Sequence, residues 1–177
     1  MNSPYIITFS GKAFNLIEPQ REQIVIEDIA HALARENRFN GHTKAAYSVA
    51  QHCYHASFCV PPEFALEALM HDAAEAYIKD MPSPIKLLLP DYRALEKRVE
   101  MAICERFGLP LALSSCVKYA DLIMLASEKR DLGITDENPW PLLNGIPVVD
   151  FTIEPMTAEV AEHLFMGRYV ELTELCK

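Results

Sequence analysis

The sequence contains no long hydrophobic run and no CxxC pair. A helix that crosses a bilayer needs about 20 mostly apolar residues, and no stretch of this chain approaches that length. Residues 1–9 have neither a basic start nor a long apolar run, so no signal peptide is expected. The five cysteines are odd in number, which argues against a disulfide framework or a zinc ribbon. We therefore expect a cytoplasmic protein with no membrane partner.

An excess of positive charge is also missing. The chain has 25 acidic and 16 basic residues, and its net charge at pH 7 is −9. Because broad binding to nucleic-acid backbones requires a basic face, we do not expect a polymeric nucleic acid as partner. Small phosphorylated substrates are compatible with this charge, since a few local cations can overcome the global field. The length of 177 residues and the hydrophobic content of 50% predict a single packed domain, 1–177.

The spacing of apolar residues predicts a mostly helical fold. Short apolar runs around Gly11 predict a hairpin over Tyr5–Ile17, and the helical period of three to four residues begins at Ile26. Further helices are predicted near 46–60, 63–78, 95–107, 115–132 and 157–175. Prolines exclude a continuous helix over 80–91, and 133–150 is expected to be a long loop. No repeat or low-complexity tract is present, and the predicted class is all-α with a small N-terminal β-hairpin.

One predicted helix carries ionisable residues on an apolar background. His71, Asp72 and Glu75 share a helical sector, because they lie three and four positions apart. Burying them is costly unless they are paired or coordinate a metal. The dipeptide alone leaves two interpretations open, a metal site or a buried His–Asp hydrogen bond with Glu75 at the rim.

Two more positions favour the metal site. Asp121 falls on the buried stripe of the predicted helix 115–132, where a carboxylate requires a partner. His52 falls on the inward stripe of the helix before 63–78, whereas His55 is expected at the surface. Two imidazoles and two carboxylates from three helices suit a divalent transition metal with open water positions.

The order of these residues resembles a known family. His52, the pair His71-Asp72 and Asp121 resemble the H…HD…D signature of the HD superfamily. The segments HDAAE at 71–75, DMPSPIK at 80–86 and KYAD at 118–121 resemble the bacterial 5′-deoxynucleotidase group. The segments IEDIAHAL at 26–33, RFNGH at 38–42 and YSVAQH at 47–52 resemble a branch common in phages and prophages. Each motif alone is weak, but their order is specific.

This resemblance implies an HD-domain helical bundle with its metal-binding core at about residues 26–133. It implies one divalent metal ion (Mn, Co, Ni, Zn, Fe or Mg) held by His52, His71, Asp72 and Asp121. HD proteins with two metals carry additional histidines before the last aspartate, and none lies between Asp72 and Asp121 here. Members of the group self-associate, so a homo-oligomer is expected, and the loop 133–150 could serve as an interface or as a lid.

The resemblance also assigns roles around the metal. Glu75 would orient or deprotonate the attacking water, and Asp80 would lie near the leaving group or sugar. Asp80 could instead be a turn or N-cap aspartate before Pro82. The candidate substrate-binding residues are Arg38, Phe39, Gly41, His42, Lys86 and Lys118.

The candidate substrate-binding residues rest on different arguments. Arg38 and Phe39 match a pair that lies against the substrate in related nucleotidases. Lys86 and Lys118 could each instead be an ordinary solvated surface residue. Gly41 could leave room around a purine, although one glycine does not determine the base, and His42 would either contact phosphate or pack behind the site.

The expected function is a metal-dependent 5′-deoxynucleotidase. It would hydrolyse deoxynucleoside monophosphates to deoxynucleoside and phosphate by attack of a metal-activated water. One alternative is a deoxynucleoside triphosphate triphosphohydrolase, similar to phage dATPases, which releases triphosphate. A second alternative is a nucleotide-binding module without turnover. The intact set of four ligands and Glu75 argue against it.

Overall fold

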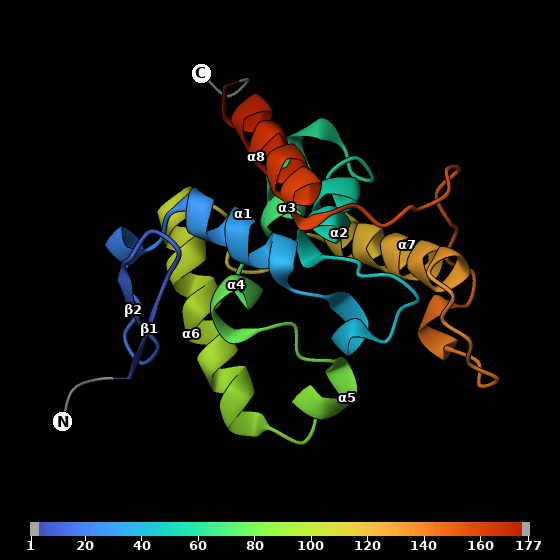
Figure 1. Ribbon diagram of the computed structural model, residues 1–177, viewed down its shortest axis with the longest axis horizontal. Helices are drawn as coiled ribbons and strands as arrows, with labels where there is room; N and C mark the ends of the chain where they lie inside the picture. The colour runs from blue at the N-terminus through green and yellow to red at the C-terminus, as the bar shows by residue number, and fades with distance from the viewer. Residues whose placement is uncertain (1–3, 175–177) are drawn as a thin grey trace.

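The computed structural model describes residues 4–174, and the N-terminal part of it is the expected hairpin. Strand β1 (Tyr5–Ile7) pairs with strand β2 (Ala13–Asn15) in antiparallel register. The turn between them includes Gly11 at φ +82°, a left-handed conformation that glycine adopts without a steric penalty. The hairpin lies beside α6 at one side of the molecule (Figure 1).

Helices make up most of the described chain, which confirms an all-α class with a small hairpin. They are α1 (Ile26–Arg35), α2 (Val49–Ala56), α3 (Ala65–Met70), α4 (Glu75–Ile78), α5 (Ser83–Lys86), α6 (Pro90–Phe107), α7 (Ser115–Asp131) and α8 (Ala158–Glu174). Short 3-10 turns occupy Arg21–Gln23, Arg38–Gly41, Pro62–Phe64 and Pro141–Leu143. Within residues 4–174, no helix is both long enough and apolar enough to pass through a membrane.

Helix α8 closes the core by packing across α1, α2 and α3 (Figure 1). Its Phe165 is fully buried in the same cluster as Leu33 of α1 and Leu69 of α3. Helix α2 lies among α1, α3, α7 and α8, so its side chains have little access to solvent. A smaller cluster that includes Tyr47 and Met124 joins the segment before α2 to α7. The interior position of α2 is what buries His52.

The helix predicted over 63–78 is not continuous. The chain makes a tight turn between α3 and α4, over His71 to Ala74. Here the amides of Ala73 and Glu75 donate to carbonyls three residues earlier, at 3.0 Å each. This shorter spacing replaces the regular helical ladder. The HDAAE segment therefore lies in a tightened turn, which apolar spacing alone does not reveal.

Other boundaries differ for identifiable reasons. Helix α2 begins at Val49 rather than near 46, because Ser48 is its N-cap and its Oγ accepts from the Gln51 amide at 3.2 Å. Short helix α5 lies inside the proline-rich segment, and α6 starts with Pro90 in its first turn. Thr157 precedes α8 as predicted, whereas the predicted end of that helix at 175 lies outside the described residues.

Candidate metal centre

The four predicted ligands converge from three parts of the fold. His52 comes from α2, His71 and Asp72 from the turn after α3, and Asp121 from α7. The Nε2 atoms of the two histidines are 3.3 Å apart. Asp72 Oδ2 lies 3.3 Å from His71 Nε2, and Asp121 Oδ1 lies 3.3 Å from His52 Nε2. The ligand atoms of His52, His71 and Asp72 lie within 4.8 Å of one another, so this group could hold a metal ion.

Both imidazole rings are oriented by acceptors on their far side. His71 Nδ1 lies 2.7 Å from the carbonyl of Ala68, and His52 Nδ1 lies 2.6 Å from Glu128 Oε1. Because these oxygens can only accept, each Nδ1 is assigned as the donor, which leaves each Nε2 lone pair to bind either a proton or a metal ion. Two such lone pairs facing each other repel unless they share a cation. The donor set therefore fits a divalent metal ion.

Glu128 is a member of this site that sequence analysis missed. Its carboxylate is fully buried, and it accepts from His52 Nδ1 through one oxygen and from Arg38 Nε, at 3.1 Å, through the other. Burial works to raise the pKa of Glu128, but Arg38 and His52 outweigh it and the pKa is lowered. Glu128 lies two helical turns after Asp121, on the same side of α7, and this spacing could have identified it.

The same charges act on the ligands themselves. Burial and the charge of Arg38 act to lower the pKa of His52. The opposing effects of Glu128 and Asp121 are larger, and the pKa is raised to about 9. Burial raises the pKa of Asp121, but the hydrogen bond and charge of His52 lower it well below its usual range. Without a cation in the group, His52 therefore holds a proton that a metal would replace.

The position of Asp121 corrects the sequence analysis. It was expected on the buried stripe of α7, but its side chain is 44% exposed. The fully buried residues of that stripe are Val117, Ala120 and Met124. Asp121 lies at the edge of the stripe, so its carboxylate reaches the histidines from the solvent side.

A cleft with a volume of about 230 Å³ adjoins the ligand group. Glu75 and Asp80 both line it, and so do the candidate ligands Asp72 and Asp121. Glu75 is buried, and its Oε2 has no hydrogen-bond partner among residues 4–174. Burial, followed by the charges of Asp72 and Asp80, raises the pKa of Glu75 to about 10. A buried carboxyl oxygen without a hydrogen bond in the described residues, beside the candidate ligands, indicates a place for a polar ligand or water.

Asp80 reaches the cleft because of an unusual backbone conformation. Lys79 has φ +77° as the chain leaves α4, and its carbonyl accepts from the Tyr92 hydroxyl at 2.8 Å. Burial raises the pKa of Asp80, and Arg38 opposes that effect. The N-cap of α5 is Pro82, with no side-chain cap, so Asp80 does not cap that helix.

The predicted substrate-binding residues separate into two groups. Arg38, Phe39 and Lys86 line the cleft, whereas Gly41 and His42 do not. Arg38 Nη1 lies 3.5 Å from Asp72 Oδ2, and Lys86 Nζ lies 2.5 Å from Glu96 and 4.0 Å from Glu75. Phe39 has φ +56°, a strained conformation that occurs often at functional sites.

Gly41 and His42 are exposed at the end of the Arg38–Gly41 turn. Gly41 has φ +73°, and no atom lies within 4 Å of the position a Cβ would take. The backbone conformation by itself therefore favours glycine at this position. The segment 133–150, expected to be an interface or a lid, does not line the cleft.

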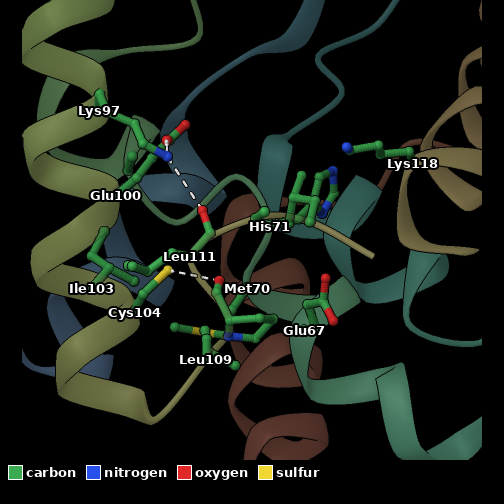
Figure 2. Close-up of a pocket in the computed structure, with 14 residues that line it drawn as sticks. Glu67, Met70, His71, Lys97, Glu100, Ile103, Cys104, Leu109, Leu111 and Lys118 are labelled. Carbon is green, nitrogen blue, oxygen red and sulfur yellow. Dashed lines mark hydrogen bonds and ion pairs between the residues drawn. The ribbon is translucent and has the colours of Figure 1, made fainter. Parts of the chain in front are cut away.

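Lys118 lines a different pocket, of about 220 Å³, between α3, α6 and the segment before α7. Figure 2 shows its ammonium group extending from α7 toward His71. Lys97 closes another part of this pocket, since its Nζ donates to the Leu111 carbonyl at 3.2 Å (Figure 2). Lys118 is thus close to the metal group but separate from the cleft cations.

His55 does not lie where the helical pattern suggested. His55 was expected at the surface, yet it is half-buried beside Phe151, with ring centroids 5.2 Å apart. Its Nε2 lies 3.3 Å from the Gln51 amide nitrogen, and Gln51 also donates to the Glu154 carbonyl at 2.8 Å. The segment before α8 covers this face of α2. Burial, followed by the charge of His52, lowers the pKa of His55 to about 4.

Comparison with known proteins gives close relatives but no activity. No protein-family model matches the chain. The uncharacterized protein YfdR of Escherichia coli (strain K12) is 51% identical over 174 residues, which cover 98% of each chain. The uncharacterized protein RCAP_rcc00048 of Rhodobacter capsulatus is 39% identical over 121 residues, or 63% of this chain and 62% of that protein. The function therefore has to be argued from the site.

Proposed function

The chain belongs to the family of the Escherichia coli protein YfdR, and we propose that it is an HD-type, metal-dependent phosphohydrolase. Its substrate would be a deoxynucleoside monophosphate, cleaved to deoxynucleoside and phosphate. The observation that carries the proposal is the convergence of two imidazole Nε2 atoms and two carboxylates beside a cleft lined by Glu75, whose Oε2 has no hydrogen-bond partner among residues 4–174. A bound divalent ion would lower the pKa of a coordinated water and polarise a phosphoryl oxygen.

The charge of the cleft supports a metal as part of this site. Its carboxylates outnumber its two cations, Arg38 and Lys86. A phosphate dianion would be repelled by such a surface unless a divalent cation offset the carboxylates. His52, His71, Asp72 and Asp121 are the residues that would hold this cation. The same residues that repel phosphate in the free protein would then belong to its binding site.

The chain's own groups have separate tasks in the proposed reaction. Arg38 is fixed through Nε by Glu128 and lies beside Asp72, which leaves guanidinium N–H groups for a phosphoryl oxygen. Burial, Asp72 and Asp80 raise the pKa of Glu75 to about 10, so it is protonated at neutral pH in the metal-free protein. A bound divalent cation would lower this pKa, and the ionised carboxylate could then accept a proton from water. Asp80, on the same wall, is available to the sugar or the leaving oxygen.

The size and charge of the cleft favour a monophosphate over a triphosphate. A volume of about 230 Å³ and two cations suit one phosphate group better than three. A triphosphate would need a further cation, and Lys118 lies in the neighbouring pocket. Triphosphohydrolase activity is therefore the second candidate. In that case Lys118 would bind a phosphate group, whereas a monophosphate would not require it.

The test is product identification with each possible substrate. Protein freed of metal with EDTA would be loaded with Mn²⁺, Co²⁺, Ni²⁺ or Mg²⁺ and incubated with each dNMP and each dNTP. Release of inorganic phosphate from a dNMP supports the proposal, whereas triphosphate from a dNTP supports the second candidate. If no metal gives turnover with any nucleotide, the chain is not this enzyme.

Two variants separate metal binding from catalysis. His71→Ala should abolish binding of Co²⁺, followed by its absorption spectrum, and with it all turnover. Glu75→Gln should keep the Co²⁺ spectrum and lose turnover. Exposed His163 and Glu63 provide matched controls, since His163→Ala and Glu63→Gln should change neither property. Full activity of Glu75→Gln would show that another group handles the proton.

A further inference from the structure

Glu128 is the most deeply buried carboxylate close to the candidate metal group. Its side chain has no exposed surface, whereas the side chain of Asp121 on the same helix is 44% exposed. A carboxylate in such a place is costly unless it is paired and hydrogen-bonded. Glu128 meets this requirement twice, once with His52 and once with Arg38. The fold thus maintains a charged group behind the site rather than in the cleft.

The two contacts of Glu128 lead to two different parts of the site. Oε1 accepts from His52 Nδ1 at 2.6 Å, and the Nε2 of the same ring faces His71 and Asp121. Oε2 accepts from Arg38 Nε at 3.1 Å, and the guanidinium continues to the wall of the cleft. One rigid carboxylate therefore joins a metal-ligating ring to a cation of the substrate cleft.

We propose that Glu128 is a positioning residue that sets the orientation of His52 and of Arg38 together. It acts through these two side chains and does not itself touch the substrate. The inference rests on the proposed function, because it assumes a metal on His52 Nε2 and a phosphate near Arg38. Its consequence is that metal affinity and phosphate affinity depend on the same buried side chain.

The chemistry of the contact requires a carboxylate of this length. A glutamine at 128 has one acceptor oxygen, and its amide N–H would point at a second donor, either His52 Nδ1–H or Arg38 Nε–H. An aspartate keeps both oxygens but is shorter by one methylene, so it cannot reach both partners without a backbone shift. Glu128→Gln and Glu128→Asp thus disturb the same pair of contacts in different ways.

The first test measures metal binding without any substrate. EDTA-treated wild type and Glu128→Gln would be titrated with Co²⁺ alone, with absorption as the readout. We expect the variant to bind Co²⁺ about tenfold to a hundredfold more weakly, as for other partners of metal-bound histidines. A dissociation constant within twofold of the wild-type value would overturn the inference. Failure of the wild type to bind Co²⁺ would instead overturn the proposed metal centre.

Glu67 provides a matched control for loss of a buried carboxylate. It is buried and accepts from both the amide and the hydroxyl of Ser114, at 2.6 and 2.8 Å. Glu67→Gln should lose stability in urea but keep the Co²⁺ affinity. If Glu128→Gln fails to fold by circular dichroism, Glu128→Asp carries the test with the same expected loss of Co²⁺ affinity.

The second test follows Arg38. At saturating metal, Glu128→Gln should raise the KM for a dNMP as well as weaken Co²⁺ binding. The double variant Glu128→Gln/Arg38→Met should have the same KM as Arg38→Met alone. Its Co²⁺ affinity should still be lower than that of Arg38→Met. An equal KM increase in both backgrounds would show that Glu128 does not act through Arg38.

Discussion

Replacing Glu75 by glutamine should stabilise the metal-free protein while it abolishes activity. In the folded state the pKa of Glu75 is raised to about 10 by burial, Asp72 and Asp80, whereas its ordinary value is 4.5. Between these values the unfolded chain is ionised at this position and the folded chain is protonated. The contribution of Glu75 to stability is therefore fully present below pH 4.5 and is lost as the pH rises towards 10.

The size of the effect follows from the pH interval. Each pH unit above 4.5 costs about 1.4 kcal/mol, which amounts to about 3 kcal/mol at pH 7. A glutamine at 75 carries no such cost. Glu75→Gln should thus unfold with a free energy about 3 kcal/mol higher than wild type at pH 7, and with no difference near pH 4.5.

The assay is urea unfolding at several pH values between 4.5 and 8, in EDTA. The chelator matters because a bound divalent cation would lower the pKa of nearby carboxyl groups. Glu63→Gln, an exposed change of the same kind, serves as the control and should follow the wild type. If wild type and Glu75→Gln show the same dependence on pH, Glu75 is ionised in the folded protein and the reasoning fails.

Three further changes test other parts of the molecule. Since burial and the charge of His52 lower the pKa of His55 to about 4, the contribution of His55 to stability should be lost as the pH falls from 6.5 towards 4. At pH 5 the free energy of unfolding in urea should be about 1 kcal/mol higher for His55→Gln than for wild type, after allowance for solvent screening. Met124→Ala, at a fully buried position, should cost about 3 kcal/mol in the same assay, and a cost below 1 kcal/mol would contradict its packing. Lys118→Met should change the KM for a dNMP less than twofold while Arg38→Met raises it about tenfold, and the reverse order would move the phosphate to the second pocket.

Regular helices are where sequence reasoning located site residues best. On α2 the three-to-four-residue spacing correctly predicted that His52 faces inward, because eight residues of uninterrupted helix keep that phase. On α7 the same reasoning located Asp121 too deep by a fraction of a turn. The apolar spacing also did not identify Glu128 as a site residue, because its partners His52 and Arg38 lie far away in the sequence.

Other features could not be obtained from periodicity at all. The tightened turn that holds His71 and Asp72 keeps the apolar pattern of a helix, so the change of hydrogen bonding leaves no trace in the sequence. Arg38 came from family resemblance alone, since it lies in a short 3-10 turn without any period. Gln51 and His55 are covered by residues about a hundred positions later, a long-range contact that a single sequence does not encode visibly.

The uneven burial of the four candidate ligands bears on how an ion would enter and leave. The histidines are 0% and 3% exposed, while Asp72 and Asp121 are 21% and 44% exposed. The carboxylates thus form the outer side of the group and the imidazoles its inner side. A hydrated cation approaching from solvent meets hard oxygen atoms first and must shed water before it reaches nitrogen. Exchange kinetics should therefore rank cations by how readily they lose water, whereas equilibrium affinity should rank them by their preference for imidazole.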